Sequence, residues 1–129
     1  IIEMKKIAVL IAAGTGMGAD AAKELAKNNY KIAILSSSGK GERLAKKLGG
    51  VGFTGSNLNA KKIEEFIKTV LKKWGRIDVL VNSAGHGPKG KILKIKDEEW
   101  ILGLETYFLN VVRATRVVTP IMKKQKNVQ

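Results

Sequence analysis

Residues 7–19 read IAVLIAAGTGMGA, an unbroken apolar run followed at once by closely spaced glycines. An apolar run without polar alternation is typical of a strand in a parallel sheet that helices cover on both faces. Gly14, Gly16 and Ala19 satisfy the pattern G-x-G-x-x-G/A, placed between this strand and a helix predicted over residues 20–28. The stretch therefore predicts the strand, turn and helix in which this pattern binds a dinucleotide.

The glycine pattern has a physical rationale. Backbone that lacks a Cβ can approach a pyrophosphate closely, and the free N–H groups and the dipole of the following helix favour negative charge. We therefore expect the pyrophosphate to lie against Gly14, Thr15, Gly16, Met17 and Gly18. In the alternative interpretation, the glycines only permit a tight turn and close helix packing.

Further apolar runs alternate with helical patterns along the chain. Strands are predicted over residues 32–35, 51–54 and 77–81, and helices over 42–48, 61–74 and from an N-cap at Asp97 toward Pro120. Such alternation predicts right-handed βαβ crossovers. We expect one dinucleotide-binding domain over residues 1–129, with a Rossmann-type doubly wound α/β architecture. Its parallel sheet would have about four strands with helices on both faces, and the chain stops where a fifth strand is expected.

Composition narrows the possible functions. The 129 residues contain no cysteine, which excludes disulfides, cysteine-ligated metals and thiol nucleophiles, and a cytoplasmic location is the default expectation. Lys and Arg number 24 against 11 Asp and Glu, for a net charge of +13. The lysines are spread over every predicted helix, so a solvated basic surface is favoured over specific nucleic-acid binding. The apolar run after Lys6 is too short to span a membrane, and we expect neither a metal site nor a membrane partner.

The end of the second predicted strand bears on the choice of cofactor. A carboxylate about twenty residues beyond the glycine turn would bind the ribose hydroxyls of NAD. Ser36, Ser37, Ser38 and Lys40 stand there instead. Hydroxyls with a cation suit a 2′-phosphate, so the sequence favours NADP over NAD. The alternative is that this segment is only a polar loop.

The segment Asn82-Ser-Ala-Gly85, after the fourth predicted strand, resembles the N-N-A-G motif of the short-chain dehydrogenases/reductases, the SDR family. Residues 75–81, Trp100 and residues 120–122 agree with neighbouring family features, and the resemblance runs from Lys5 to Met122. It implies that Asn82, Ala84 and Gly85 line the ribose of the cofactor and stabilise the sheet. It also implies that Asn57 and Leu58, where the family has an Asp and an apolar residue, contact the adenine.

One departure concerns the glycine turn, which in the family reads T-G-x-x-x-G-x-G. Alignment on Gly16 and Gly18 puts Ile11 and Ala12 at the Thr and the first Gly. The methyl of Ala12 would lie near the turn, and Gly14 is expected to supply the missing freedom two residues later. We therefore expect binding with altered local geometry.

A second departure concerns catalysis. The catalytic Ser, and the Tyr with a Lys four residues later, follow the fifth and sixth strands in the family, so no catalytic residue is assigned here. The family's helix Asn falls at Tyr107, with Asn110 one turn further on. Tyr107 is not the missing Tyr, because Val111 stands where its Lys would be. It is expected to pack on the sheet or on a partner subunit. His86 is expected to be a loop residue near the mouth of the cofactor site.

The resemblance implies a function for the parent protein. This would be an NAD(P)(H)-dependent oxidoreductase acting on a small carbonyl or alcohol substrate, and this chain would be its cofactor-binding portion, inactive alone. It also implies a homo-oligomer formed through the helix that begins near Asp97. The alternative is a non-catalytic nucleotide-binding or protein-interaction module with an SDR-derived fold.

Overall fold

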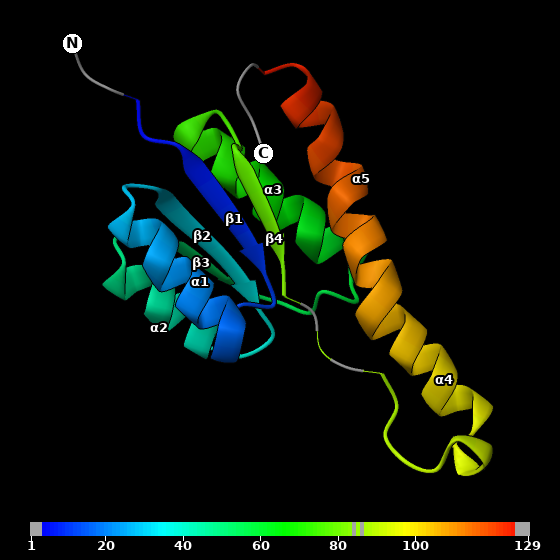
Figure 1. The fold of residues 1–129 in the computed structure, drawn as a ribbon. Helices are drawn as coiled ribbons and strands as arrows, with labels where there is room; N and C mark the ends of the chain where they lie inside the picture. Colours follow the sequence, from blue (N-terminus) through cyan, green and yellow to red (C-terminus); the bar gives the residue numbers. More distant parts are fainter. Residues whose placement is uncertain (1–3, 84, 86, 126–129) are drawn as a thin grey trace.

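The computed structural model describes residues 4–83, 85 and 87–125. Strands and helices alternate along them (Figure 1). The elements are β1 (Ile7–Ile11), α1 (Gly16–Lys27), β2 (Lys31–Ser36), α2 (Lys40–Lys47), β3 (Val51–Thr54), α3 (Ala60–Trp74), β4 (Val79–Asn82), the 3-10 turn η1 (Ile92–Lys94), α4 (Asp97–Leu104), the π-helical turn η2 (Glu105–Leu109) and α5 (Asn110–Lys123). Within these residues, the model contains no helix with the length and apolar character needed to cross a membrane.

The four strands form one parallel sheet in the order β3-β2-β1-β4. In β1, Ile11 lies in register between Leu35 of β2 and Asn82 of β4. All four carboxyl ends therefore lie along the same edge of the sheet. The strand order reverses between β1 and β4, which is where open α/β sheets bind their ligands. The predicted doubly wound parallel architecture is confirmed.

Helices cover both faces of the sheet, with α1 and α2 on one side and α3 and α5 on the other (Figure 1). Side chains alternate along β1 accordingly. Ala8 and Leu10 pack in the core beneath α1 and α2, whereas Val9 and Ile11 pack in the core with α3 and α5. A strand that is buried on both sides needs apolar residues at every position, which explains the unbroken run in the sequence.

The amphipathic helix α3 anchors the larger core. Its residues Ile63, Phe66, Ile67 and Val70 are all buried, as the spacing predicts. Each such side chain contributes about 1.5–3 kcal/mol when it is fully removed from water. The helix starts with the Asn59 side chain accepting from the Lys62 N–H at 3.3 Å, and it ends at Gly75 with φ 74°. Both signals are typical helix boundaries.

Two helices begin earlier than the sequence predicts. Helix α1 starts at Gly16, inside the glycine turn, and α2 starts at Lys40 rather than at residue 42. Lys40 therefore belongs to the first turn of α2 and not to the preceding loop. Turn-forming residues conceal a helix start of this kind, because small residues are also common at N-termini.

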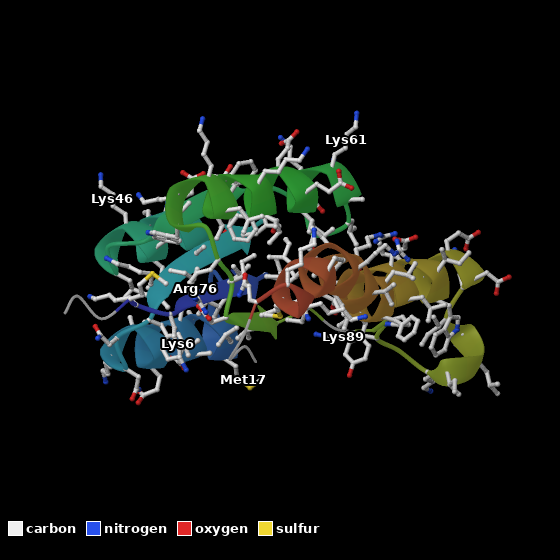
Figure 2. All side chains as sticks on the ribbon, turned by 90° about the horizontal axis from the view of Figure 1, so that it is seen from above. Lys6, Met17, Lys46, Lys61, Arg76 and Lys89 are labelled. Carbon is white, nitrogen blue, oxygen red and sulfur yellow. The ribbon has the colours of Figure 1, made fainter. Side chains whose placement is uncertain are left out.

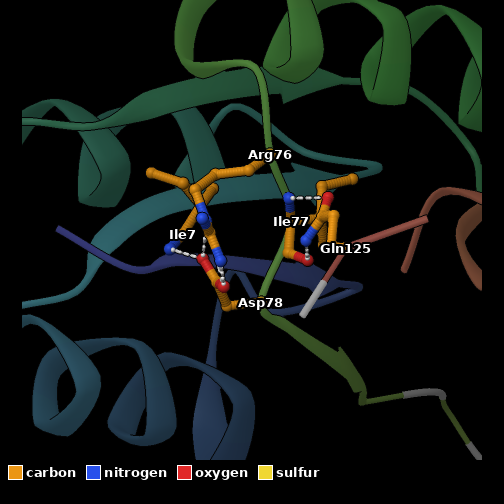
Figure 3. Close-up of polar contacts among 5 residues, drawn as sticks. All are labelled: Ile7, Arg76, Ile77, Asp78 and Gln125. Atoms are coloured by element: carbon orange, nitrogen blue, oxygen red, sulfur yellow. Dashed lines mark hydrogen bonds and ion pairs between the residues drawn. The ribbon is translucent and has the colours of Figure 1, made fainter. Parts of the chain in front are cut away.

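The fourth strand begins two residues later than expected. The side chain of Gln125 binds both backbone groups of Ile77, accepting from its N–H at 3.1 Å and donating to its C=O at 2.7 Å (Figure 3). These hydrogen bonds satisfy polar groups that a neighbouring strand would otherwise satisfy. A side chain 48 positions away thus completes the backbone pairing of Ile77.

The long C-terminal helix differs from the prediction at its start and in its middle. Lys96 is the N-cap, so Asp97 is the first helical residue and not the cap. The helix then changes to π geometry over η2 before it resumes as α5, which continues past Pro120 to Lys123. A π turn inside an α-helix is rare and frequently marks a functional site.

Candidate dinucleotide-binding site

Two hollows open at the carboxyl edge of the sheet, on either side of the turn after β1. The first, the β2-side hollow, has a volume of about 140 Å³. Its walls come from the turn after β1, the end of β2 and the loop after β3. It is lined by Ala12, Gly14, Thr15, Leu35, Ser36, Ser37, Ser38, Gly55 and Asn57.

The second, the β4-side hollow, is larger, with a volume of about 680 Å³. The start of α1, the end of β4 and the π turn η2 surround it. It is lined by Met17, Gly18, Ala21, Val81, Asn82, Ser83, Gly85, Tyr107, Phe108 and Val111. The glycine turn thus separates a small polar hollow from a larger and more apolar one.

At two positions of the turn, neighbouring atoms leave no room for a side chain, so glycine is required. A Cβ on Gly14 would lie 2.5 Å from Ser36 Oγ. A Cβ on Gly18 would lie 2.6 Å from Ser83 Oγ and 2.8 Å from the Cα of Ala13. The backbone therefore packs closely against the ends of both neighbouring strands. No side chain projects from these two positions, so a ligand can lie across the turn.

Left-handed backbone occurs elsewhere in the turn, at Ala12 with φ 61° and at Gly16 with φ 58°. We expected Gly14 to supply the conformational freedom that Ala12 lacks. That expectation is wrong, because the left-handed residue remains Ala12 itself and Gly14 is needed for close packing. A Cβ in this region costs about 1–2 kcal/mol. The Ala12 N–H nevertheless donates to Leu35 O at 2.7 Å, which holds the turn against β2.

The N-terminus of α1 points its backbone donors toward the turn. Its N-cap, Thr15, makes no side-chain capping hydrogen bond within the described part of the chain. Residues 16–19 also contain no carboxylate that could compete for these N–H groups. Uncapped donors and the helix dipole together favour an anion at this position.

The serines after β2 differ in their exposure. Ser36 is only 7% exposed, and its Oγ accepts from the Ser38 N–H at 3.4 Å. Ser37 and Ser38 are exposed and line the β2-side hollow. Lys40 is exposed but does not line it. The segment between β2 and α2 thus brings hydroxyls to the hollow, whereas the cation of Lys40, at the start of α2, lies outside its lining.

Asn57 lies in the loop after β3 and lines the β2-side hollow. Its Nδ2 donates to Asn110 Oδ1 at 2.8 Å, so its own Oδ1 stays available as an acceptor. Leu58 is 38% exposed and lines neither hollow. The structure therefore brings only the first residue of this pair to the site.

Asn82 ends β4 and lines the β4-side hollow with Gly85. Its Oδ1 is buried without a hydrogen-bond partner among the described residues. A buried polar atom without a partner is costly, so this oxygen is suited to a ligand hydroxyl. Gly16 lies on the turn but lines neither hollow, and Ala84 and His86 lie outside the described residues.

Tyr107 and Phe108 belong to η2 and are 63% and 60% exposed. Tyr107 lines the β4-side hollow, and it is not among the side chains that pack in the two cores of the sheet. It also lines a smaller apolar hollow of about 220 Å³ with Trp100, Gly103 and Leu104.

The start of β4 is fixed by an ion pair beneath the site. Asp78 is 1% exposed, accepts from the Ile7 N–H at 2.8 Å and binds the Arg76 guanidinium in a bidentate manner (Figure 3). Burial alone would raise the pKa of Asp78, but the hydrogen bonds from Arg76 and Ile7, together with the positive charges of Arg76 and Lys6, outweigh burial and lower the pKa below its ordinary value. The pair anchors β4 to β1.

No charged side chain is among the described residues that line either hollow. Figure 2 shows Lys46 and Lys61 on the outer sides of α2 and α3, away from the sheet. Both side chains are exposed. Among the described residues, no group of three or more His, Cys, Asp or Glu could hold a metal ion.

The parallel sheet, the glycine turn at its switch point and the uncapped helix behind it define a Rossmann-type α/β domain. The family model described as short chain dehydrogenase matches residues 6–129. The chain therefore belongs to the short-chain dehydrogenase family, as its motifs indicated.

Curated relatives agree with this assignment. The 3-oxoacyl-(acyl-carrier-protein) reductase of Staphylococcus epidermidis is 29% identical over 96% of this chain and 54% of its own length. The corresponding reductase of Synechocystis sp. is 30% identical over 95% of this chain and 52% of its own. The chain thus spans about half the length of the curated relatives it matches.

Solved structures show the same relation. The aldohexose dehydrogenase of Thermoplasma acidophilum superposes with a TM-score of 0.83 and 26% identity, over 94% of this chain and 46% of that one. A variant of the actinorhodin polyketide ketoreductase with NADPH superposes with a TM-score of 0.82 and 28% identity, over 88% of this chain and 46% of that one.

Several lining residues escaped the sequence analysis. Gly55 follows the short strand β3, and Phe108 and Val111 lie on the helix that the resemblance treats mainly as an interface. Asn110 was noticed for its position but not for its partner. A polar residue on the buried face of a helix was the available signal, because buried amides need a hydrogen bond.

Proposed function

We propose that this chain binds a pyridine dinucleotide, NADP(H) in preference to NAD(H), as the cofactor portion of an oxidoreductase that interconverts a carbonyl and an alcohol. The observation that carries the proposal is the pair of hollows on either side of a glycine turn that packs closely at Gly14 and Gly18. Membership of the short-chain dehydrogenase family supports it. The bound nicotinamide would supply or accept the hydride.

The chain's own residues have distinct tasks in this proposal. The N–H groups of residues 16–18 receive the pyrophosphate at the start of α1. The β2-side hollow holds the adenosine end, where Asn57 Oδ1 can accept from the adenine amino group. Asn82 Oδ1 meets a ribose hydroxyl in the β4-side hollow. Thr15 and Met17 flank the pyrophosphate, and Leu58, Ala84 and Gly85 are assigned to the cofactor by resemblance.

The preference for NADP rests on the chemistry at the end of β2. Ser36, Ser37 and Ser38 supply hydroxyl and N–H donors, and Lys40 opens the next helix. No carboxylate stands among residues 36–41 to repel a 2′-phosphate. A polyketide ketoreductase of the same fold was determined with NADPH, which agrees with this choice.

Calorimetric titration with NADPH and NADH tests the proposal. We expect NADPH to bind more tightly, and Ser37→Asp to reduce or reverse the preference by placing a charge beside the 2′-phosphate. Thr115→Asp adds the same charge on the exposed side of α5 and serves as the matched control. Failure of the unaltered chain to bind either nucleotide would overturn the proposal. Tighter binding of NADH would overturn the cofactor preference alone.

Substrate turnover is proposed for the whole protein and not for this chain. The relatives are named as a 3-oxoacyl-(acyl-carrier-protein) reductase and an aldohexose dehydrogenase, and this chain matches only about half of the length of the curated ones. We expect the 129-residue chain to bind NADPH without oxidising it in the presence of a 3-oxoacyl thioester. Steady turnover by the purified chain would contradict this part of the proposal.

A second candidate is assembly through α4, favoured by its exposed apolar side chains. Trp100, Ile101, Leu102 and Leu104 are 40–60% exposed on this helix. Exposed apolar patches of this kind mark interaction surfaces. We propose a homo-oligomer through this surface, to be tested by sedimentation with Leu102→Glu. A monomer at all concentrations, with and without the substitution, would contradict it.

A further inference from the structure

The π turn η2 touches both halves of the candidate site. Directly after its last residue, Asn110 at the start of α5 accepts at 2.8 Å from Asn57, which lines the β2-side hollow. In its middle, Thr106 packs against the loop after β4, because a Cβ on Gly85 would lie 3.1 Å from Thr106 Cγ2. Tyr107 projects into the wall of the β4-side hollow. One helical turn therefore contacts the loops that border each hollow.

The burial of Asn110 indicates that its contact with Asn57 is the reason for a polar residue at this position. It is completely buried, yet its Nδ2 has no hydrogen-bond partner among the described residues. An apolar side chain would avoid the cost of burying that amide. Within the described residues, the hydrogen bond from Asn57 is thus the side-chain interaction that a polar residue at this position provides.

The same turn is fixed from its other side. Glu105, at the start of η2, forms an ion pair with Arg113 of α5, so this pair spans the π turn. The ion pair between Glu105 and Arg113 therefore links the start of the π turn to the helix that follows it. Asn110 connects the turn to the loop after β3, which carries Asn57. A movement of that loop on binding would reach the turn through the Asn57 amide.

We propose that Asn110 is a positioning residue that couples the two halves of the dinucleotide site. It orients the Asn57 amide for the adenosine end and transmits occupancy of that end to η2, and so to Tyr107 and Phe108 at the other end. The inference rests on the proposed binding of NADP(H). It adds a coupling between the two hollows that the binding itself does not require.

Hydrogen exchange measured by mass spectrometry tests the coupling, with adenosine 2′,5′-bisphosphate as the probe because it reaches only the adenosine end. In the unaltered chain, the probe should slow exchange at residues 14–18 and, by about 5-fold or more, at residues 105–110. In Asn110→Leu, which keeps similar volume without the amide, the slowing should persist at 14–18 and disappear at 105–110.

Substitutions of Asn57, the hydrogen-bond partner of Asn110, test the proposal even if Asn110→Leu does not fold. Asn57→Ala should also remove the slowing at 105–110, and adding Asn110→Leu to it should change nothing further. Asn57→Asp should restore it, because the Asn110 amide can turn and donate its Nδ2 to a carboxylate.

The outcomes separate the two claims. If the unaltered chain binds neither the probe nor NADPH, the proposed function fails and the coupling fails with it. If the chain binds the probe but residues 105–110 are not slowed, or are slowed equally in Asn110→Leu, the coupling alone is overturned.

Discussion

Gly14 lies so close to Ser36 that a Cβ on the glycine would stand 2.5 Å from the serine Oγ. This contact brings the turn after β1 against the end of β2, and both residues line the β2-side hollow. The glycine is thus required here by a neighbouring side chain, and its backbone is not left-handed.

Gly14→Ala is predicted to displace Ser36 and reduce NADPH affinity by at least about 10-fold, with a stability cost of about 1–3 kcal/mol from overpacking. Calorimetric titration and urea unfolding measure the two effects. Adding Ser36→Gly should restore part of both, because the crowded side chain is then gone. Gly18→Ala should not be rescued by Ser83→Gly, since its Cβ also meets the Ala13 Cα at 2.8 Å. Equal rescue at both sites would contradict this explanation.

Ala12→Gly is predicted to stabilise the chain by about 1 kcal/mol, because Ala12 adopts a φ of 61° that disfavours a side chain. The measurement is the midpoint of urea unfolding at constant slope. Ala13→Gly is a matched control in the same turn and should destabilise, since its methyl is buried. An Ala12→Gly variant less stable than the unaltered protein would refute the assignment of strain.

Arg76→Met is predicted to destabilise the fold by about 3 kcal/mol, because it leaves the Asp78 carboxylate buried without its cation. Adding Asp78→Asn should recover part of the loss, since the remaining group is neutral. Thermal unfolding of the unaltered chain, Arg76→Met and the double variant measures this. If Arg76→Met were as stable as the unaltered protein, the ion pair would not anchor β4.

Stability should also fall in acid because of Asp78. Its pKa is lowered in the folded chain, so the unfolded chain takes up the proton first as the pH falls. The stabilisation is fully present above the ordinary Asp pKa of about 4 and is lost as the pH falls through the lower folded value. Urea unfolding measured between about pH 2 and pH 6 should show that the free energy of unfolding depends less on pH in Asp78→Asn than in the unaltered chain. An identical pH dependence in the two proteins would contradict the lowered pKa of Asp78.

Gln125→Ala is predicted to cost about 1–3 kcal/mol, because the buried Ile77 would lose partners for both its N–H and its C=O. Gln125→Glu keeps an acceptor for the N–H and should lose only part of that amount. Thermal melts of both variants provide the comparison. Equal losses would show that the two hydrogen bonds do not act separately.

The strands and α3 could be predicted because their signals are local. The run at β1 is buried on both faces, and the apolar positions of α3 share one face, so sequence spacing alone indicates them. Helix starts at Gly16 and Lys40 were less accessible, since the same residues also suit turns.

Long-range partners could not be predicted. The Gln125 side chain beside Ile77 and the Asn110 amide beside Asn57 join residues that are 48 and 53 positions apart. Only the fold shows that they meet. The left-handed Ala12 was missed for a related reason, because residue type there opposes the conformation that the packing of the turn imposes.

The central claim is that one dinucleotide crosses the glycine turn from the β2-side hollow to the β4-side hollow. Backbone NMR shifts of the labelled chain during titration with NADPH test it most directly. We predict that the largest changes fall on residues 14–18, on 36–38, and on Asn57 and Asn82. Saturable binding whose backbone shifts fall instead on α4, or an absence of shifts at the turn, would contradict the account.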